Sequence, residues 1–203
     1  MRELHPRPRT EPAASDAAIV AELRAGARAA AALLFDRYGG HVDRLLWSLL
    51  GPEPEAEDLL HEVFLRALAG IGDLEDPSRL RSWLTGIAVH TAREWIRKKV
   101  RRSWLRFVQE VPELEVASAS EEVTEATRRT FAVLSAMGAD ERVVFSLRFI
   151  EGMEMAEIAV ACDVSVSTAK RRLKDAEKHF LARARHEPAL KSWIEEGGRW
   201  ATT

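Results

Sequence analysis

The sequence has little of what several protein classes require. Among its 203 residues there is a single cysteine, Cys162, so neither a disulfide framework nor a multi-cysteine zinc site can form within the chain. No uncharged apolar run approaches the roughly 20 residues that a membrane span needs, and we expect no membrane insertion. The first ten residues are rich in Pro and Arg and contain no apolar segment, so they are not a secretory signal. A cytoplasmic protein is the expectation.

Glycine and proline are also scarce, at 11 and 8 residues, and runs of β-branched residues are few. Ala, Leu, Arg and Glu dominate instead, which favours helices. With 46% hydrophobic residues the chain can build real cores, and we expect an all-α fold. No phosphate-binding GxxxxGK loop is present, and His61-Glu62 lacks the second His of a zinc-protease motif because position 65 is Leu. We therefore expect no enzyme, no metal and no cofactor.

The charges nearly cancel, with 30 Lys and Arg against 32 Asp and Glu, a net charge of −2 and a pI near 6.3. Nucleic-acid binders usually have a basic pI, so the average argues mildly against such a partner. The order of the charges argues the other way. The blocks are acidic 53–76, basic 79–106, acidic 110–125 and basic 170–185. One such run is usually a solvated helix face, but two basic blocks separated by an acidic segment indicate charged partners.

Apolar spacing and helix breakers divide the chain into two small helical domains joined by an acidic flexible linker. The clearest helix is 56–68, where apolar residues recur at the spacing of one helix face. We expect Gly39-Gly40 to break an earlier helix that starts near Ser15. The full set of expected segments is a disordered 1–14, helices 15–38, 41–50, 56–68 and 79–102, a linker at 103–120, helices 121–137, 140–150, 155–162 and 167–186, and an extension at 187–203.

Residues 153–180 carry the sharpest local pattern, that of a helix-turn-helix. A short helix ends at Cys162, and Asp163 tolerates the left-handed conformation that tight turns often need. Ser165 or Ser167 can cap the next helix. The residues expected on the inner side of that helix are Val166, Ala169, Leu173, Ala176 and Phe180. Arg171 lies opposite them, where a side chain can enter the major groove and contact guanine. The simpler alternative is an amphipathic helix with a solvated basic face.

The helix expected at 79–102 interleaves tryptophans with cations. Aromatic rings can stack on exposed nucleobases while cations follow the phosphates, which suits single-stranded or melting DNA. The simpler alternative is that the rings are core residues. At helical spacing we expect Trp95 to be core, whereas Trp83 lies near the loop before the helix and either role fits it.

Three segments together resemble RNA polymerase sigma factors of the sigma-70 family, in the extracytoplasmic-function (ECF) group. Residues 56–68, AEDLLHEVFLRAL, are similar to the core-binding helix of that family, and residues 83–102, WLTGIAVHTAREWIRKKVRR, to its promoter-melting helix. Residues 134–176 resemble its −35-recognition domain. The resemblance implies sigma region 2 at 15–102 and sigma region 4 at 121–186. It also implies that the acidic linker runs through polymerase channels that normally hold nucleic acid.

The same resemblance implies partners and residue roles. The partners are promoter DNA and core RNA polymerase, through its β′ clamp helices and β flap, with an anti-sigma factor as a further candidate. The side chains that would dock on core polymerase are Glu57, Asp58, Leu59, His61, Glu62, Phe64 and Arg66. Those that would melt and read the −10 element are Trp83, His90, Thr91, Glu94, Arg97 and Lys98, with the loop at 72–78. Those that would read the −35 element are Ser165, Ser167, Thr168, Lys170, Arg171 and Lys174.

The chain departs from the family pattern at several positions. The family usually has Gln, Asn, Asp, Gly and Val where this sequence has His61, His90, Glu94, Asp163 and Ala169. His61 lies on the expected docking surface, whereas His90 and Glu94 lie in the expected −10 reader.

The extension at 187–203, which carries Trp193 and Trp200, continues past the usual end of the family. It either packs on its own domain, with a short helix after Pro188, or serves as a regulatory element or a partner surface. Two other functions stay open beside the sigma factor. One is a helix-turn-helix transcriptional regulator that acts without polymerase, and the other is a sigma-like interaction adaptor.

Overall fold

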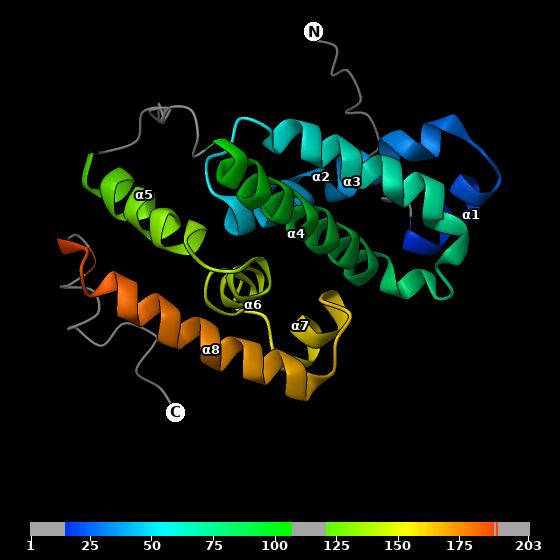
Figure 1. Ribbon diagram of the computed structural model, residues 1–203. Helices are drawn as coiled ribbons and strands as arrows, with labels where there is room; N and C mark the ends of the chain where they lie inside the picture. Colours follow the sequence, from blue (N-terminus) through cyan, green and yellow to red (C-terminus); the bar gives the residue numbers. More distant parts are fainter. Residues whose placement is uncertain (1–14, 107–120, 189, 191–203) are drawn as a thin grey trace, which may run out of the picture.

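The structure of the chain, a computed structural model, describes residues 15–106, 121–188 and 190. Throughout these residues it is helical and has no strand, which confirms the all-α expectation (Figure 1). The elements are α1 (Asp16–Arg24), α2 (Arg28–Leu50), α3 (Ala56–Gly70), the 3₁₀ helices η1 (Ile71–Asp73) and η2 (Pro77–Arg79), α4 (Leu80–Arg106), α5 (Glu121–Ser135), α6 (Ala139–Phe149), α7 (Met155–Ala161) and α8 (Val166–Ala184). The expectations for 1–14 and for most of the linker, 107–120, fall outside the described residues.

The first helix break falls at Gly26, and the expectation of a break at Gly39-Gly40 is wrong. Gly26 has a φ of 76°, in the left-handed region, and lies between α1 and α2. Gly39 and Gly40 lie inside α2, which continues to Leu50. Gly39 is buried, and a Cβ atom there would lie 3.4 Å from the ring of Phe35. A helical glycine costs only about 1 kcal/mol, which the burial of a long helix offsets.

Helices α1 to α4 form the first helical unit, in which α2, α3 and α4 pack against one another. The apolar stripe of α3 is buried at Val63, Phe64 and Ala67. Helix α4 places Leu84 and Trp95 in the same core, which confirms the expectation for Trp95. The unit therefore has a substantial core of its own.

The loop between α3 and α4 is held in place by α1. Both η1 and η2 contact α1. The guanidinium of Arg24 donates hydrogen bonds to the main-chain oxygens of Ile71 and Leu74, whose side chains are buried. At the start of η2, the Asp76 carboxylate accepts a hydrogen bond of 2.9 Å from the Ser78 N–H. The loop expected to engage melted DNA is thus an ordered structure of the free chain.

Helices α5 to α8 form the second helical unit, in which α5, α6 and α7 each contact α8. Its own core includes Phe145 and Phe180, which stack with ring centroids 4.5 Å apart. Leu190, near the start of the extension, is 3% exposed and belongs to this core. The extension therefore begins by packing on its own unit, whereas Trp193 and Trp200 lie outside the described residues.

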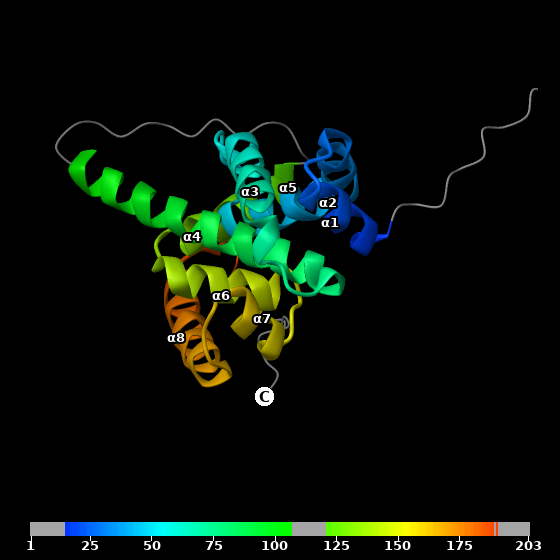
Figure 2. The ribbon, with the colours of Figure 1, turned by 90° about the vertical axis from the view of Figure 1, so that its right-hand side faces the viewer.

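The two units pack closely on each other (Figures 1 and 2). Helix α4 contacts α6 and α7, and α2 contacts α6. One continuous hydrophobic core contains Leu84 of the first unit together with Ile158, Cys162 and Ala169 of the helix-turn-helix. The inner face of the helix-turn-helix is therefore buried partly against the first unit.

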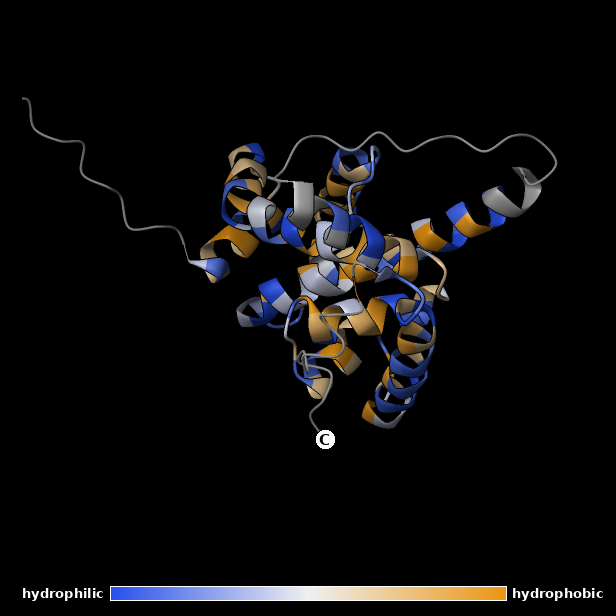
Figure 3. Cartoon of the chain, turned by 90° about the vertical axis from the view of Figure 1, so that its left-hand side faces the viewer, coloured by the Kyte–Doolittle hydropathy of each residue, from blue (hydrophilic) through white to orange (hydrophobic). Residues whose placement is uncertain are grey.

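Helix α4 runs to Arg106, four residues beyond the end expected at residue 102 and into the segment assigned to the linker. Figure 2 shows its C-terminal turns projecting past the neighbouring helices, and residues 97–102 are all exposed. In Figure 3 this projecting end and α8, at the lower right, both show hydrophilic residues along their length with apolar ones between them. Hydrophilic residues therefore recur along both helices.

Candidate nucleic-acid and docking interfaces

The helix-turn-helix is fixed by its turn and by two caps. Glu154 and Glu157 form a capping box at the start of α7. Asp163 has a φ of 53°, the left-handed conformation expected for it. Ser165 caps α8, since its hydroxyl accepts a hydrogen bond of 3.2 Å from the Thr168 N–H. Backbone geometry and caps together set the direction in which α8 leaves the turn.

The outer face of α8 carries most of the predicted −35 readers. Ser167, Lys170, Arg171 and Lys174 are exposed, and Thr168 is half-buried beside the cap. Ala169, Ala176 and Phe180 are buried on the opposite side, as expected. Val166, expected on the inner side, is instead 42% exposed, because the buried face begins only at Ala169.

The predicted −10 readers on α4 divide into exposed and buried groups. His90, Arg97 and Lys98 are exposed. Thr91 is only 2% exposed and its hydroxyl donates to the main-chain oxygen of Ile87 at 2.9 Å, so it faces the core and not a ligand. Inside a helix, the hydroxyl of threonine commonly donates to the main-chain oxygen four residues earlier.

Trp83 lines a cavity of about 450 Å³ between the two units. The loop contributes Asp73 to Asp76, α4 contributes Trp83, Ile87 and His90, and the helix-turn-helix contributes residues 160–163. Trp83 is half-buried, which fits both roles that its sequence position left open, that of a core residue and that of a ring that stacks on a base. In this arrangement the helix-turn-helix forms one wall beside the predicted −10 reader.

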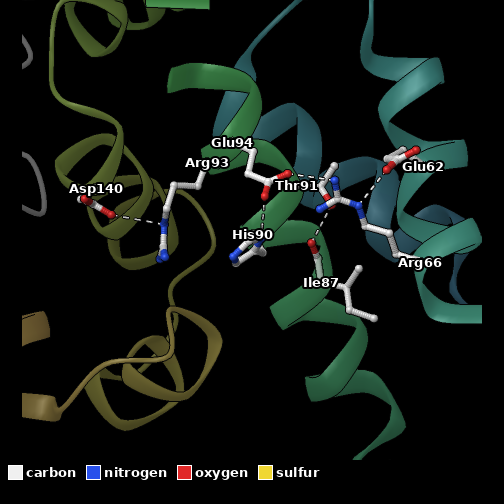
Figure 4. A network of polar contacts seen from close by, with 8 residues as sticks. All are labelled: Glu62, Arg66, Ile87, His90, Thr91, Arg93, Glu94 and Asp140. Carbon is white, nitrogen blue, oxygen red and sulfur yellow. Dashed lines mark hydrogen bonds and ion pairs between the residues drawn. The ribbon is translucent and has the colours of Figure 1, made fainter. Parts of the chain in front are cut away.

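A polar network connects α3 with α4 (Figure 4). Arg66 of α3 donates from Nε to Glu62 and from Nη2 to Glu94 of α4, each at 2.8 Å. His90 Nδ1 lies 3.5 Å from the other Glu94 oxygen. The hydrogen bonds that Arg66 donates to Glu62 and Glu94 raise the pKa of Arg66, and the hydrogen bond that Glu94 accepts from Arg66 lowers the pKa of Glu94. Arg66 thus has both of its partners within the chain.

The predicted docking face of α3 is only partly exposed. Glu57, Asp58 and His61 are exposed, and Leu59, Glu62 and Arg66 are half-buried. Phe64 lies in the core instead, 6% exposed and with its ring centroid 5.0 Å from that of Phe35. Sequence reasoning missed Leu65, which is 63% exposed between His61 and Arg66 on this face. The sequence did indicate it, because Leu65 is a large apolar residue that falls outside the apolar stripe of α3.

Acid–base contacts between the units were also missed. Asp140 of α6 lies 3.2 Å from Arg93, 2.9 Å from Arg97 and 3.4 Å from Arg172 of α8. Arg93 also donates to the main-chain oxygen of Cys162 at 3.2 Å. One carboxylate thereby faces cations of both basic blocks. No local pattern could have indicated it, because the three arginines come together only in the tertiary structure.

Arg142, beside this cluster, is 3% exposed. It donates to the main-chain oxygens of Leu49 and Leu50 at the end of α2, at 2.8 and 2.7 Å. Burial lowers the pKa of Arg142 to about 10. A buried guanidinium therefore binds the carbonyls that the end of helix α2 leaves without helical partners.

Within residues 15–106 and 121–188, no three His, Cys, Asp or Glu side chains lie where they could hold a metal ion. Among the described helices, none is both long and apolar enough to cross a membrane.

Comparison with known proteins identifies the two units. Residues 34–102 match Sigma-70 region 2, and residues 128–180 match Sigma-70, region 4. The chain belongs to the ECF sigma factors of the sigma-70 family. Sigma factors of this family are non-enzymatic factors, and the function of this one is transcription initiation. Region 2 corresponds to the first helical unit from residue 34, in the first third of α2, to residue 102, and region 4 to most of the second unit.

Two relatives named as ECF sigma factors match this chain over most of their length. The ECF RNA polymerase sigma factor SigX of Bacillus subtilis (strain 168) is 34% identical in an alignment of 164 residues, which covers 73% of this sigma factor and 82% of SigX. The ECF RNA polymerase sigma-E factor of Escherichia coli (strain K12) is 26% identical in an alignment of 170 residues, which covers 78% of this sigma factor and 88% of sigma-E.

Two solved structures share the fold of this sigma factor. CnrH, solved in complex with the cytosolic domain of CnrY, has a TM-score of 0.58 and 22% identity, covering 85% of this chain and 98% of that chain. The sigma factor RpoE from Bartonella quintana, solved with the anti-sigma factor NepR, has a TM-score of 0.56 and 19% identity, covering 75% and 95%.

Proposed function

We propose that this sigma factor binds core RNA polymerase through α3, reads and melts the −10 element with α4 and its preceding loop, and reads the −35 element with α8. The observation that carries the proposal is that α4 and α8 each expose cations on one side while the opposite side is fixed in a core. Such helices can present side chains to DNA without losing their place in the fold. The chain itself performs no catalysis in this role and acts in the cytoplasm.

The exposed face of α3 is suited to docking on polymerase. Asp58, His61 and Leu65 lie on it, and Leu65 is 63% exposed, so a partner that covers this face would bury a large apolar side chain. We expect Leu65→Glu to weaken core binding at least tenfold in a pull-down with purified core polymerase. Ile150→Glu, at another exposed apolar position, is the matched control and should leave the affinity unchanged. Equal affinity of the two variants would remove Leu65 from the docking face.

Melting is proposed to rely on the loop before α4. Trp83 and residues 73–76 line the cavity described above, next to a helix rich in cations. An unpaired base held there offsets an unstacking cost of a few kcal/mol, and an aromatic ring adds stacking. Trp83→Ala should therefore reduce open-complex formation more than it reduces binding to a promoter already melted at −10.

Promoter binding is proposed to require separation of the two units. In the described arrangement Asp140 occupies Arg93 and Arg97, and the helix-turn-helix covers one side of the α4 reader. Fluorophores at exposed positions of α3 and α8 should report a larger distance in the promoter complex than in the free chain. An unchanged distance would show that the packed form itself binds the promoter.

Run-off transcription with purified core polymerase and a promoter library tests the whole proposal. A polymerase-dependent transcript from a restricted set of promoters is the expected result. A gel shift of duplex DNA without any such transcript would favour a regulator that acts without polymerase, and neither result would favour an adaptor. An anti-sigma factor is a further proposed partner, of the kind solved with the RpoE of Bartonella quintana. A purified anti-sigma factor should lower transcript yield in the same assay.

A further inference from the structure

Glu94 is the only acidic residue in the basic stretch 79–106. It lies on α4, the helix to which we assign −10 reading, and its side chain is 36% exposed. A carboxylate beside DNA phosphates is repelled unless a cation compensates it or it accepts hydrogen bonds from the DNA. Its presence on this surface therefore needs a physical explanation.

The explanation lies in Arg66, on the neighbouring helix. Its Nη2 donates to one Glu94 oxygen at 2.8 Å, while its Nε donates to Glu62 at the same distance. Figure 4 shows the guanidinium between the two carboxylates, with its side chain spanning from α3 to α4. The planar fork of arginine fits two acceptors at once, which an ammonium group cannot match in geometry. Arg66 thus compensates part of the negative charge of Glu94, which it shares with Glu62, and fixes the Glu94 carboxylate from outside its own helix.

The second Glu94 oxygen faces His90 one helical turn earlier. His90 Nδ1 lies 3.5 Å from it, and the His90 side chain is 60% exposed. His90 and Glu94 are also the two positions of the predicted −10 reader that depart from the family pattern. Arg66, Glu94 and His90 therefore form a line of contacts that leads from α3 to the exposed edge of α4.

We propose that Arg66 is a specificity-positioning residue for the −10 element: it holds Glu94, and through it His90, in the orientation that reads a base. This rests on the proposed function and replaces the docking role that the resemblance implied for Arg66. A fixed carboxylate accepts a hydrogen bond from the amino group of cytosine. The nitrogens of the adjacent imidazole can each donate a hydrogen bond to a base or accept one from it. The base preference of this sigma factor should depend on a residue of α3 that itself need not touch DNA.

The test measures base preference and core affinity separately. The holoenzyme of each variant transcribes a library randomised across the −10 element, and a pull-down measures affinity for core polymerase. Arg66→Met should lower transcription from the preferred −10 sequence roughly tenfold and change the base ranking at one or two positions, with core affinity kept within about twofold. Arg66→Lys should show a smaller change in the same direction.

A double variant isolates the contact. Arg66→Met combined with Glu94→Gln removes the charge that Arg66→Met leaves uncompensated on α4, so transcription should recover while the original base ranking does not. Arg37→Met is the matched control, because Arg37 also ties its own helix, α2, to a preceding helix, through Asp16 of α1, away from α4 and this network. It should leave the base ranking unchanged, as a purely structural tie would.

Two results would overturn the inference alone. One is an unchanged base ranking for Arg66→Met with reduced core affinity, which would return Arg66 to the docking face. The other is an additive double variant, which would show that Arg66 and Glu94 act independently. A wild-type holoenzyme that gives no transcript would instead overturn the proposed function, and the inference with it.

Discussion

The two helical units differ in how they bury their apolar residues. In the first unit, α2, α3 and α4 enclose a hydrophobic core, to which the loop residues Ile71 and Leu74 also contribute. The second unit has a smaller core of its own around Phe145 and Phe180. Its helix-turn-helix instead buries Ile158 and Cys162 in the core of the first unit. The half that would read −35 thus depends on its neighbour for part of its burial.

The difference extends to the polar contacts. Within the first unit, charged contacts such as Arg66 with Glu94 join its own helices, whereas Asp140 and Arg142 of the second unit bind residues of the first. These contacts are available only while the units are packed. The stability of the helix-turn-helix and its freedom to separate from the first unit are therefore opposed.

The largest effect is expected from Arg142→Met. It leaves the buried oxygens of Leu49 and Leu50 without their donors, at about 1–3 kcal/mol for each unsatisfied group. We expect the free energy of unfolding to fall by about 2–5 kcal/mol and the second unit to melt first. Urea unfolding followed by circular dichroism measures both. A single transition at the wild-type midpoint would show that this contact does not join the units.

The next largest effect is expected from Gly51→Ala. Gly51 has a φ of 74°, and a Cβ atom there would lie 2.7 Å from the ring of Phe131 of the second unit. Backbone strain and overpacking together should destabilise the folded chain by about 2–4 kcal/mol. Gly72→Ala is the control, since a Cβ there meets nothing within 4 Å. Thermal unfolding midpoints that match for the two variants would contradict the close packing at Gly51.

Arg171→Ala separates DNA reading from stability. Arg171 is exposed on the outer face of α8, so the unfolding midpoint should not move. Loss of one bidentate base contact should weaken discrimination of the −35 element by about 1–3 kcal/mol. Competition binding with −35 variants measures this, and Arg183→Ala, nearer the end of α8, serves as the control. Unchanged discrimination would remove Arg171 from the proposed reader.

The smallest effect is expected from Ser165→Ala, which removes the cap of α8 and touches neither core. A lost N-cap costs about 1 kcal/mol. We expect a small loss of stability confined to the second unit, seen as faster amide exchange in the first turn of α8. Equal exchange in the variant and the wild type would mean that the turn alone fixes the helix start.

Much of the fold could be predicted from local signals, and the failures have a common cause. The stripe of 56–68, the left-handed Asp163 and the Ser165 cap are each specified by a few neighbouring residues. Gly39, Thr91 and Val166 were misplaced because their burial depends on how far a helix face extends in the packed molecule. Leu65 could have been found, since it falls outside the α3 stripe, whereas Asp140 and Arg142 gave no local signal.

The sequence by itself determined most of the helices, the helix-turn-helix and the two basic blocks, because periodicity, caps and charge order act over a few residues. It was also enough to identify the family. Only the tertiary structure decided that the two units share a core, that Asp140 faces arginines of both basic blocks, and that Arg66 serves Glu94. These features join residues far apart in the chain, and the burial and charge that create them exist only after the helices have packed. The near-zero net charge thus conceals opposite charges that meet within the folded molecule.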